Sequence, residues 1–175
     1  MTERVQALMG WTGKESATII FDSTTDEFTR RGFFDKIRGK PNIALVATTS
    51  EGDVFGGFYS VAVNRQSKNS YDRNMFIFSF ESHGRCATPQ KFCVKEGLRD
   101  QVRVRYSKND NNGFVGFWAN GNSGFRLGNE NSDSNCFNLS NGFEGVHDTT
   151  LTGKNGPYDK GPYHHCSRLV AVQLS

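Results

Sequence analysis

A pair of adjacent glycines stands inside the apolar segment Val54–Tyr59, whose sequence is Val-Phe-Gly-Gly-Phe-Tyr. Glycine weakens a strand, so a strand that contains Gly56 and Gly57 needs their small size, either for a bulge or for a neighbour packed directly on the backbone. After a polar loop, the segment from Met75 to Phe80 alternates large apolar residues with the period of a strand. We therefore expect residues 54–80 to form the sheet core of one mostly β domain.

Other short segments are rich in β-branched and aromatic residues and end at turn residues, which predicts further strands. These segments are 17–21, 42–49, 92–94, 102–106 and 169–174. One helix is expected to begin after Asp22 or Ser23, either of which can cap its N-terminus, and to end at Gly39. Its apolar residues are Phe28, Phe33, Phe34 and Ile37. A shorter helix is predicted over residues 3–9, ended by Gly10.

The chain has 175 residues, a length that fits one domain. It contains 15 Phe, a residue that favours sheet packing over long helices. Residues 109–145 are rich in Asn and Gly with interleaved aromatic residues, which predicts short strands between tight turns. The predicted fold is mainly β with peripheral helices (α+β), a β-sandwich of two antiparallel sheets. We assign residues 1–16 to an N-terminal helical extension and residues 17–175 to the domain.

No apolar run reaches the length of a transmembrane helix, and the first residues lack the apolar centre of a secretory signal. We therefore expect no membrane insertion and an intracellular location, cytoplasmic or nuclear. The four cysteines are not closely paired in sequence, so we expect free thiols in a reducing compartment. They are Cys86, Cys93, Cys136 and Cys166.

Basic residues concentrate between positions 85 and 108, where seven basic side chains outnumber two acidic ones. They are Arg85, Lys91, Lys95, Arg99, Arg103, Arg105 and Lys108. The simplest interpretation is a solvated face, and the alternative is a surface for an anionic partner, either nucleic acid or an acidic protein patch. A nucleic acid would contact Arg103, Arg105 and Lys108 and would need rings on which bases stack. The candidate rings are Tyr106, Phe114, Phe117 and Trp118.

Two cysteine-containing motifs are candidates for chemistry. Cys86 follows Arg85, and a nearby cation favours the thiolate, so Cys86 is the candidate redox residue. His164-His165-Cys166 is the densest group of soft metal ligands, but zinc needs three or four ligands and no second pair is near in sequence. We predict no metal site, no cofactor and no catalytic residue, and we interpret residues 164–166 as a surface loop that enters the last strand.

The order of these signals resembles the TLDc domain, the module of the oxidation-resistance proteins, over residues 17–174. The resemblance rests on a strand that ends in Phe21-Asp22-Ser23, a helix with Phe33-Phe34, and an F-G-G-[FY] strand followed by F-x-F-S. In this chain the signature residues, to which we assign a structural role, are Phe55, Gly56, Gly57, Phe58, Phe76, Phe78 and Ser79.

The resemblance implies a β-sandwich of two antiparallel sheets with flanking helices, a role in resistance to oxidative stress, and binding to subunits of the vacuolar proton-pumping ATPase. No established catalytic residues come with it. The chain departs from the family pattern at three places. Asp26-Glu27 replaces Asp-Gly, Gly116-Phe117-Trp118 replaces F-G-G, and Ala171 stands near the position of the usual Glu.

Three functions remain as hypotheses. The first is a non-catalytic, regulatory protein-binding module in the response to oxidative stress, so we expect a binding module rather than an enzyme. The alternative is a nucleic-acid-binding, stress-responsive regulator that uses residues 85–108. The second alternative is a thiol-based antioxidant protein that uses Cys86.

Overall fold

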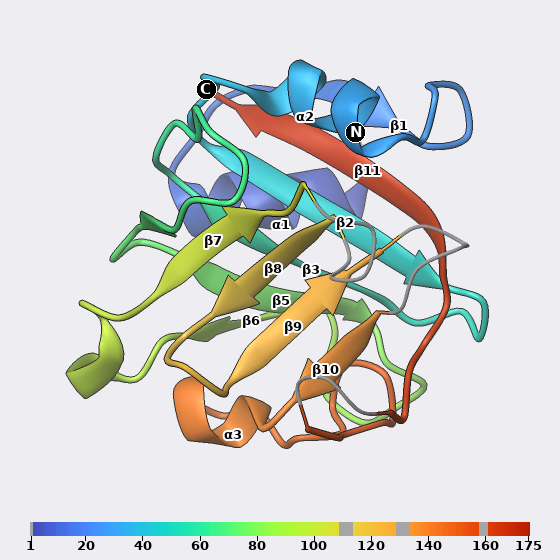
Figure 1. Ribbon diagram of the computed structural model, residues 1–175. Helices are drawn as coiled ribbons and strands as arrows, with labels where there is room; N and C mark the ends of the chain where they lie inside the picture. The colour runs from blue at the N-terminus through green and yellow to red at the C-terminus, as the bar shows by residue number, and fades with distance from the viewer. Residues whose placement is uncertain (1, 109–113, 129–133, 158–160) are drawn as a thin grey trace.

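Two antiparallel sheets pack face to face in the computed structural model, which describes residues 2–108, 114–128, 134–157 and 161–175 (Figure 1). The first sheet has the order β1 (Ala17–Asp22), β11 (Cys166–Leu174), β2 (Ile43–Thr49), β3 (Val54–Tyr59), β5 (Phe76–Glu81), β6 (Gln90–Cys93). The second has the order β10 (Asn135–Phe137), β9 (Gly124–Leu127), β8 (Val115–Trp118), β7 (Arg103–Tyr106), β4 (Ser70–Tyr71). The predicted β-sandwich is confirmed. Residues 109–113 and 129–133 of the Asn- and Gly-rich segment lie outside the described residues.

The last strand is central rather than peripheral, because β11 lies between β1 and β2 and pairs with both. It begins at Cys166, three residues before the predicted start at Leu169. Its register places Leu169 opposite Ala47 and Ala171 opposite Leu45. The end of the chain therefore joins the first strand to the rest of the sheet.

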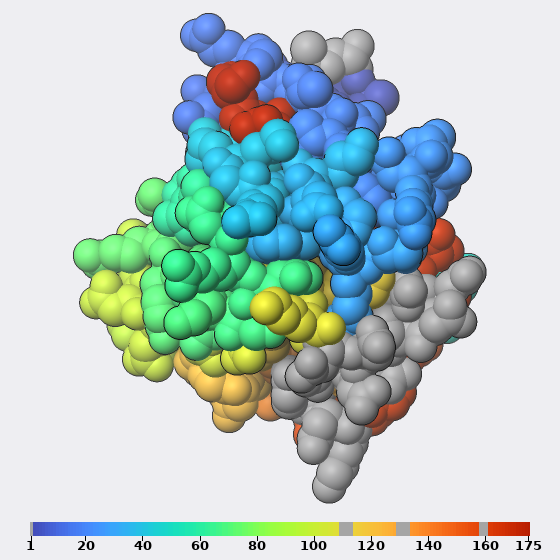
Figure 2. Space-filling model, turned by 45° about the horizontal axis from the view of Figure 1, so that its top comes forward, coloured from blue at the N-terminus to red at the C-terminus, as the bar shows by residue number. Residues whose placement is uncertain are grey.

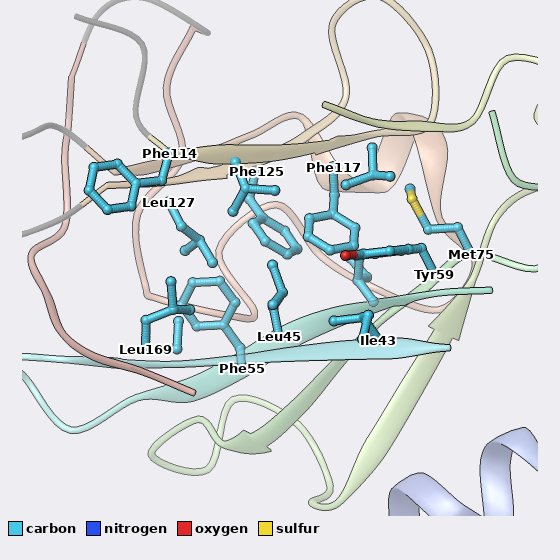
Figure 3. Close-up of a cluster of buried hydrophobic side chains, with 14 of the residues drawn as sticks. Ile43, Leu45, Phe55, Tyr59, Met75, Phe114, Phe117, Phe125, Leu127 and Leu169 are labelled. Carbon is cyan, nitrogen blue, oxygen red and sulfur yellow. The ribbon is translucent and has the colours of Figure 1, made fainter. Parts of the chain in front are cut away.

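The inner faces of the two sheets share one aromatic and aliphatic core (Figure 3). Phe55 of β3 meets Phe125 of β9 edge to face at 5.3 Å between ring centroids, and Phe125 stacks on Phe117 at 5.0 Å. Tyr59 and Tyr106 share a hydrogen bond of 2.7 Å between their hydroxyl groups across the sandwich. Burial raises the pKa of both phenols, so the pair remains neutral over the physiological range.

The two glycines of β3 leave space on opposite faces of the strand. A Cβ on Gly57 would lie 2.5 Å from the Phe117 ring of the opposing sheet. A Cβ on Gly56 would lie 1.8 Å from the Leu45 carbonyl oxygen and 2.7 Å from the Phe78 ring. The predicted packing of a neighbour onto bare backbone is confirmed at both positions.

The outer face of the first sheet is covered by α1 (Glu3–Thr12), which lies on the side away from the second sheet (Figure 1). Trp11 packs on three rings of β5, with centroid distances of 6.1, 5.8 and 5.8 Å to Phe76, Phe78 and Phe80. The prediction that Gly10 ends this helix is wrong, because the helix continues to Thr12 and ends at Gly13, where φ is 68°. A glycine inside a helix costs about 1 kcal/mol relative to alanine, and burial of the Trp11 ring offsets that cost.

The second helix, α2 (Arg30–Ile37), covers one end of the sandwich and buries Phe33, Phe34 and Ile37 in the inter-sheet core. Figure 2 shows this end, where the segment around α2, in lighter blue, is flanked by the loop after β3, in green. The predicted caps are wrong: Thr29 caps the helix by accepting a 3.1 Å hydrogen bond from the Gly32 amide. Asp22 instead ends β1, and the Ser23 hydroxyl accepts a hydrogen bond from the Leu169 amide of β11.

The remaining helical elements are short. They are the 3₁₀ turn η1 (Glu96–Leu98) after β6 and α3 (Leu139–Gly142) after β10. In the described residues, no helix is long and apolar enough to cross a membrane.

Candidate functional site

All seven signature residues are buried and none lies on a free surface. Phe55 faces the second sheet, whereas Phe58, Phe76 and Phe78 belong to the outer cluster under α1. The Ser79 hydroxyl is also buried, without a hydrogen-bond partner among the described residues. These residues build the packing of the first sheet, and two of them, Phe58 and Phe76, also lie under a surface groove.

The basic residues of 85–108 separate onto different parts of the molecule. Arg85 is directed into the protein, where its guanidinium pairs with the buried Asp53 carboxylate. The same guanidinium donates hydrogen bonds of 3.0 and 3.2 Å to the carbonyls of Thr150 and Leu151. These contacts tie the loop after β5 to the β2–β3 turn, which gives Arg85 a structural role.

Arg103 and Arg105 alternate with buried residues along β7, so both lie on the outer face of the second sheet. The Arg103 guanidinium lies 5.6 Å from the centroid of the Trp118 ring. Lys108 follows at the exposed end of this strand. The rings proposed to stack on bases are not available there. Their exposed fractions are 1% for Tyr106, 4% for Phe114, 0% for Phe117 and 8% for Trp118.

Lys91 and Arg99 line a groove of about 470 Å³ at the outer side of the first sheet. Two cations from distant parts of the sequence complete it, Lys14 after α1 and Arg73 before β5. Lys95, which precedes η1, is half-buried and does not line the groove. We call this site the basic groove, and no Asp or Glu is among the residues that line it.

Three rings line the floor of the basic groove: Trp11 of α1 is partly exposed, whereas Phe58 of β3 and Phe76 of β5 are buried. Lys91 spans this floor, with its ammonium 5.2 Å from the Phe76 ring centroid and 3.4 Å from the Trp11 carbonyl oxygen. A cation over an aromatic face is stabilised by the ring quadrupole. The contact holds the Lys91 charge beside the groove.

The other cations differ in how their charge is balanced. Arg73 pairs with Asp100 at 3.3 Å and Arg99 pairs with Glu96 at 3.1 Å. Both carboxylates are strongly exposed, with side-chain exposed fractions of 83% and 81%. Lys14 has no ion pair within the described residues. The groove therefore presents more positive than negative charge.

A buried carboxylate fixes the loop that carries Arg73. Asp72 accepts hydrogen bonds from the Ser60 hydroxyl at 2.8 Å and from the Asn74 amide at 2.9 Å. Ser60 and Asn74 both line the basic groove, so Asp72 positions two of its polar groups. Sequence reasoning missed Lys14 and Arg73, because only the fold brings them to the 85–108 segment.

A comparison with protein-family models matches residues 1–139 of this chain to the TLDc domain. The chain belongs to the TLDc domain family. A search of curated proteins found no match. The match includes α1, the F-G-G-F strand and all four cations of the basic groove, so the groove lies within the part that is recognised as TLDc.

One departure of this TLDc domain from the family pattern lies in its core. Ala171, at the position near which the family usually has Glu, is fully buried in the inter-sheet cluster. Leu45 of β2 is its register partner.

The cysteines of the TLDc domain are all free thiols, as expected. The Cys86 sulfur lies 3.4 Å from the Ser82 hydroxyl, and the neighbouring Arg85 is already paired with Asp53. The cation that was expected to activate Cys86 is thus neutralised by a carboxylate. Burial raises the pKa of Cys136 and Cys166 to about 12, whereas Cys93 is exposed and lines the basic groove.

The interpretation of residues 164–166 as a surface loop is wrong for His164, which is 5% exposed and meets Phe55 edge to face at 5.4 Å. A backbone bridge to Ser134 holds it there. Neither ring nitrogen has a hydrogen-bond partner among the described residues. Burial, helped by Lys154 and His165, lowers the pKa of His164 to about 3. Within the described residues, no three His, Cys, Asp or Glu are placed to hold a metal ion.

Proposed function

We propose that this TLDc domain is a non-catalytic binding module that acts in the response to oxidative stress through contact with another protein. Membership of the TLDc family, matched over residues 1–139, carries the proposal. The burial of every signature residue supports it, because the most distinctive part of the sequence serves packing rather than chemistry.

The partner we propose is the peripheral sector of the vacuolar proton-pumping ATPase, as the family resemblance implies. The proposal requires the chain to act inside the cell. The exposed basic groove supports a partner that presents negative charge, because neutralisation of unpaired cations favours association and speeds encounter.

The proposal is tested by affinity purification of the tagged chain from its own cells under native conditions, followed by mass spectrometry. ATPase subunits are expected in the eluate, and nuclease treatment should leave their recovery unchanged. Parallel samples with and without peroxide test the link to oxidative stress. Failure to recover any ATPase subunit would exclude the ATPase as partner, and nuclease-sensitive recovery would favour the nucleic-acid alternative.

A further inference from the structure

The cations of the basic groove come from four separate elements. Lys14 follows α1, Arg73 precedes β5, Lys91 lies on β6 and Arg99 follows η1. In a phosphate site, backbone amides and cations usually converge on one point. Cations that surround an aromatic floor instead suit a ligand with several separated negative charges and an apolar part between them.

The lining groups suit a peptide. The volume of about 470 Å³ lies in the range of small-ligand sites, which accommodate a few side chains. The partly exposed Trp11 ring provides an apolar contact, and the side chains of Asn42 and Asn74 provide donors and acceptors for a peptide backbone. A bound segment can thus use both apolar and polar contacts.

The two carboxylates beside the groove are easily displaced. Among the described residues, the side chains of Glu96 and Asp100 form only exposed ion pairs, and such pairs contribute at most about 1 kcal/mol. Ligand carboxylates can replace them on Arg73 and Arg99 at little cost. Lys14 and Lys91 require no such exchange within the described residues.

We propose that the basic groove binds an acidic, extended segment of a protein partner, with carboxylates on the surrounding cations and an apolar side chain against Trp11. This inference rests on the proposed protein-binding function and names the chemistry of the partner segment. Its specificity comes from charges placed around an apolar centre, since charge complementarity sets both orientation and rate of association.

The test uses the full chain and a fluorescein-labelled oligoglutamate peptide with one central phenylalanine, followed by fluorescence anisotropy at low ionic strength. We expect saturable binding that weakens with salt. Lys91→Gln and Lys14→Gln should each weaken it roughly tenfold. Arg105→Gln, which removes an exposed cation from the other sheet, is the matched control and should change affinity less than about twofold. A peptide with Gln at every Glu position should not bind.

A second readout locates the ligand without a change in the groove cations. Cys93 is exposed in the groove, whereas Cys86 lies outside the groove lining, so alkylation of both by iodoacetamide can be followed by mass spectrometry. The oligoglutamate peptide should slow alkylation of Cys93 several-fold and leave that of Cys86 unchanged. Equal protection of both thiols would overturn the proposed location.

Other outcomes overturn the proposal directly. These are absence of saturable binding, equal weakening by Arg105→Gln, and equal displacement of the peptide by inorganic phosphate or by oligothymidylate. The peptide can fail to bind while the Lys91→Gln variant recovers as much of the ATPase subunits as the native chain does. In that case the groove does not bind an acidic segment, and the proposed function stands. If the peptide binds but no ATPase subunit is recovered, the groove binds acidic segments and the ATPase is excluded as the partner.

Discussion

The hydrogen atom that replaces a side chain at Gly57 decides how closely the two sheets approach. A Cβ there would lie 2.5 to 2.9 Å from three carbon atoms of the Phe117 ring, which is itself fully buried. Overpacking of a closed core costs about 1–3 kcal/mol, and a larger or branched residue costs more. The clash is steric, so a smaller side chain at position 117 of the opposing sheet should relieve it.

We expect Gly57→Ala to lower the free energy of unfolding by about 1–3 kcal/mol and Gly57→Val to unfold the domain. Phe117→Leu should cost less in the Gly57→Ala background than in the native chain, because it removes the clashing ring. Urea unfolding of the four chains measures the coupling. A Gly57→Val protein with native thermal stability would refute the packing explanation.

His164 is a second residue whose effect on stability depends mainly on its burial. Its pKa is about 3 in the folded chain and about 6.5 when histidine is exposed to water, so the unfolded state binds the proton more readily. The stability that depends on neutral His164 is complete above pH 6.5 and is lost as pH falls toward 3. The expected slope is about 1.4 kcal/mol per pH unit in this window.

We expect the free energy of unfolding of His164→Phe to fall less steeply than that of the native chain between about pH 6.5 and about pH 4.5. The Asp22 carboxylate, whose pKa is lowered, takes up its proton below this range. Urea unfolding at several pH values measures the slope. His147→Gln is the matched control, since His147 is exposed and does not contribute to the lowered pKa of His164, and should leave the slope unchanged. A native slope in His164→Phe would show that other groups dominate.

At single residues, sequence patterns predicted the backbone conformation better than the tertiary contacts of the side chains. The alternation of Arg103 and Arg105 with buried neighbours follows from the period of a strand and was predictable. The burial of His164 was not, because it depends on a bridge to Ser134 from a distant segment. The same holds for Arg85, whose partner Asp53 lies on another turn.

Between elements, the Arg85–Asp53 pair joins the loop after β5 to the β2–β3 turn and to residues 150 and 151. Removal of Arg85 would leave the Asp53 carboxylate, with a side-chain exposed fraction of 2%, without its cation. Loss of one partner from a fully buried pair costs about 3–5 kcal/mol, and the 27% exposure of the Arg85 side chain reduces this.

We therefore expect Arg85→Ala to lower the free energy of unfolding by about 2–3 kcal/mol. Arg105→Ala, at an exposed position of the same basic segment, should change it by less than about 0.5 kcal/mol. Chemical denaturation of both variants decides between structural and surface roles for Arg85. Equal, small effects would return Arg85 to the candidate binding residues.

The helix α1 raises the question of whether residues 1–16 are a separable extension. Leu8 is 1% exposed, and Trp11 covers three phenylalanine rings of β5. Deletion of residues 1–16 would expose this apolar face, and large exposed apolar patches promote association. We expect the shortened chain to aggregate or to bind a hydrophobic dye, measured by light scattering and dye fluorescence. A monomeric, natively stable chain from residue 17 onward would show that the extension is separable.

For the molecule as a whole, the sandwich could be predicted from sequence, whereas the basic groove could not. Strand periodicity and the F-G-G-F motif are local signals, and they predicted most strands. Helix ends were less predictable, because burial of Trp11 outweighed the breaking tendency of Gly10. The groove joins residues 14, 73, 91 and 99, whose proximity follows only from the packing of α1 and the order of the sheet.

The positive charge of the basic groove can be tested without a ligand. Cys93 lies among these cations, so the anionic reagent iodoacetate should be attracted to it, whereas neutral iodoacetamide should not. A unit charge about 7 Å away in water changes a local concentration about two- to threefold. Lys91→Gln and Lys14→Gln should each lower the ratio of the two alkylation rates at Cys93 by that factor at low salt, and added salt should remove the difference. Arg105→Gln should leave the ratio unchanged.

An unchanged ratio in Lys91→Gln would mean that the groove cations create no net positive potential at Cys93, because Glu96 and Asp100 already balance them.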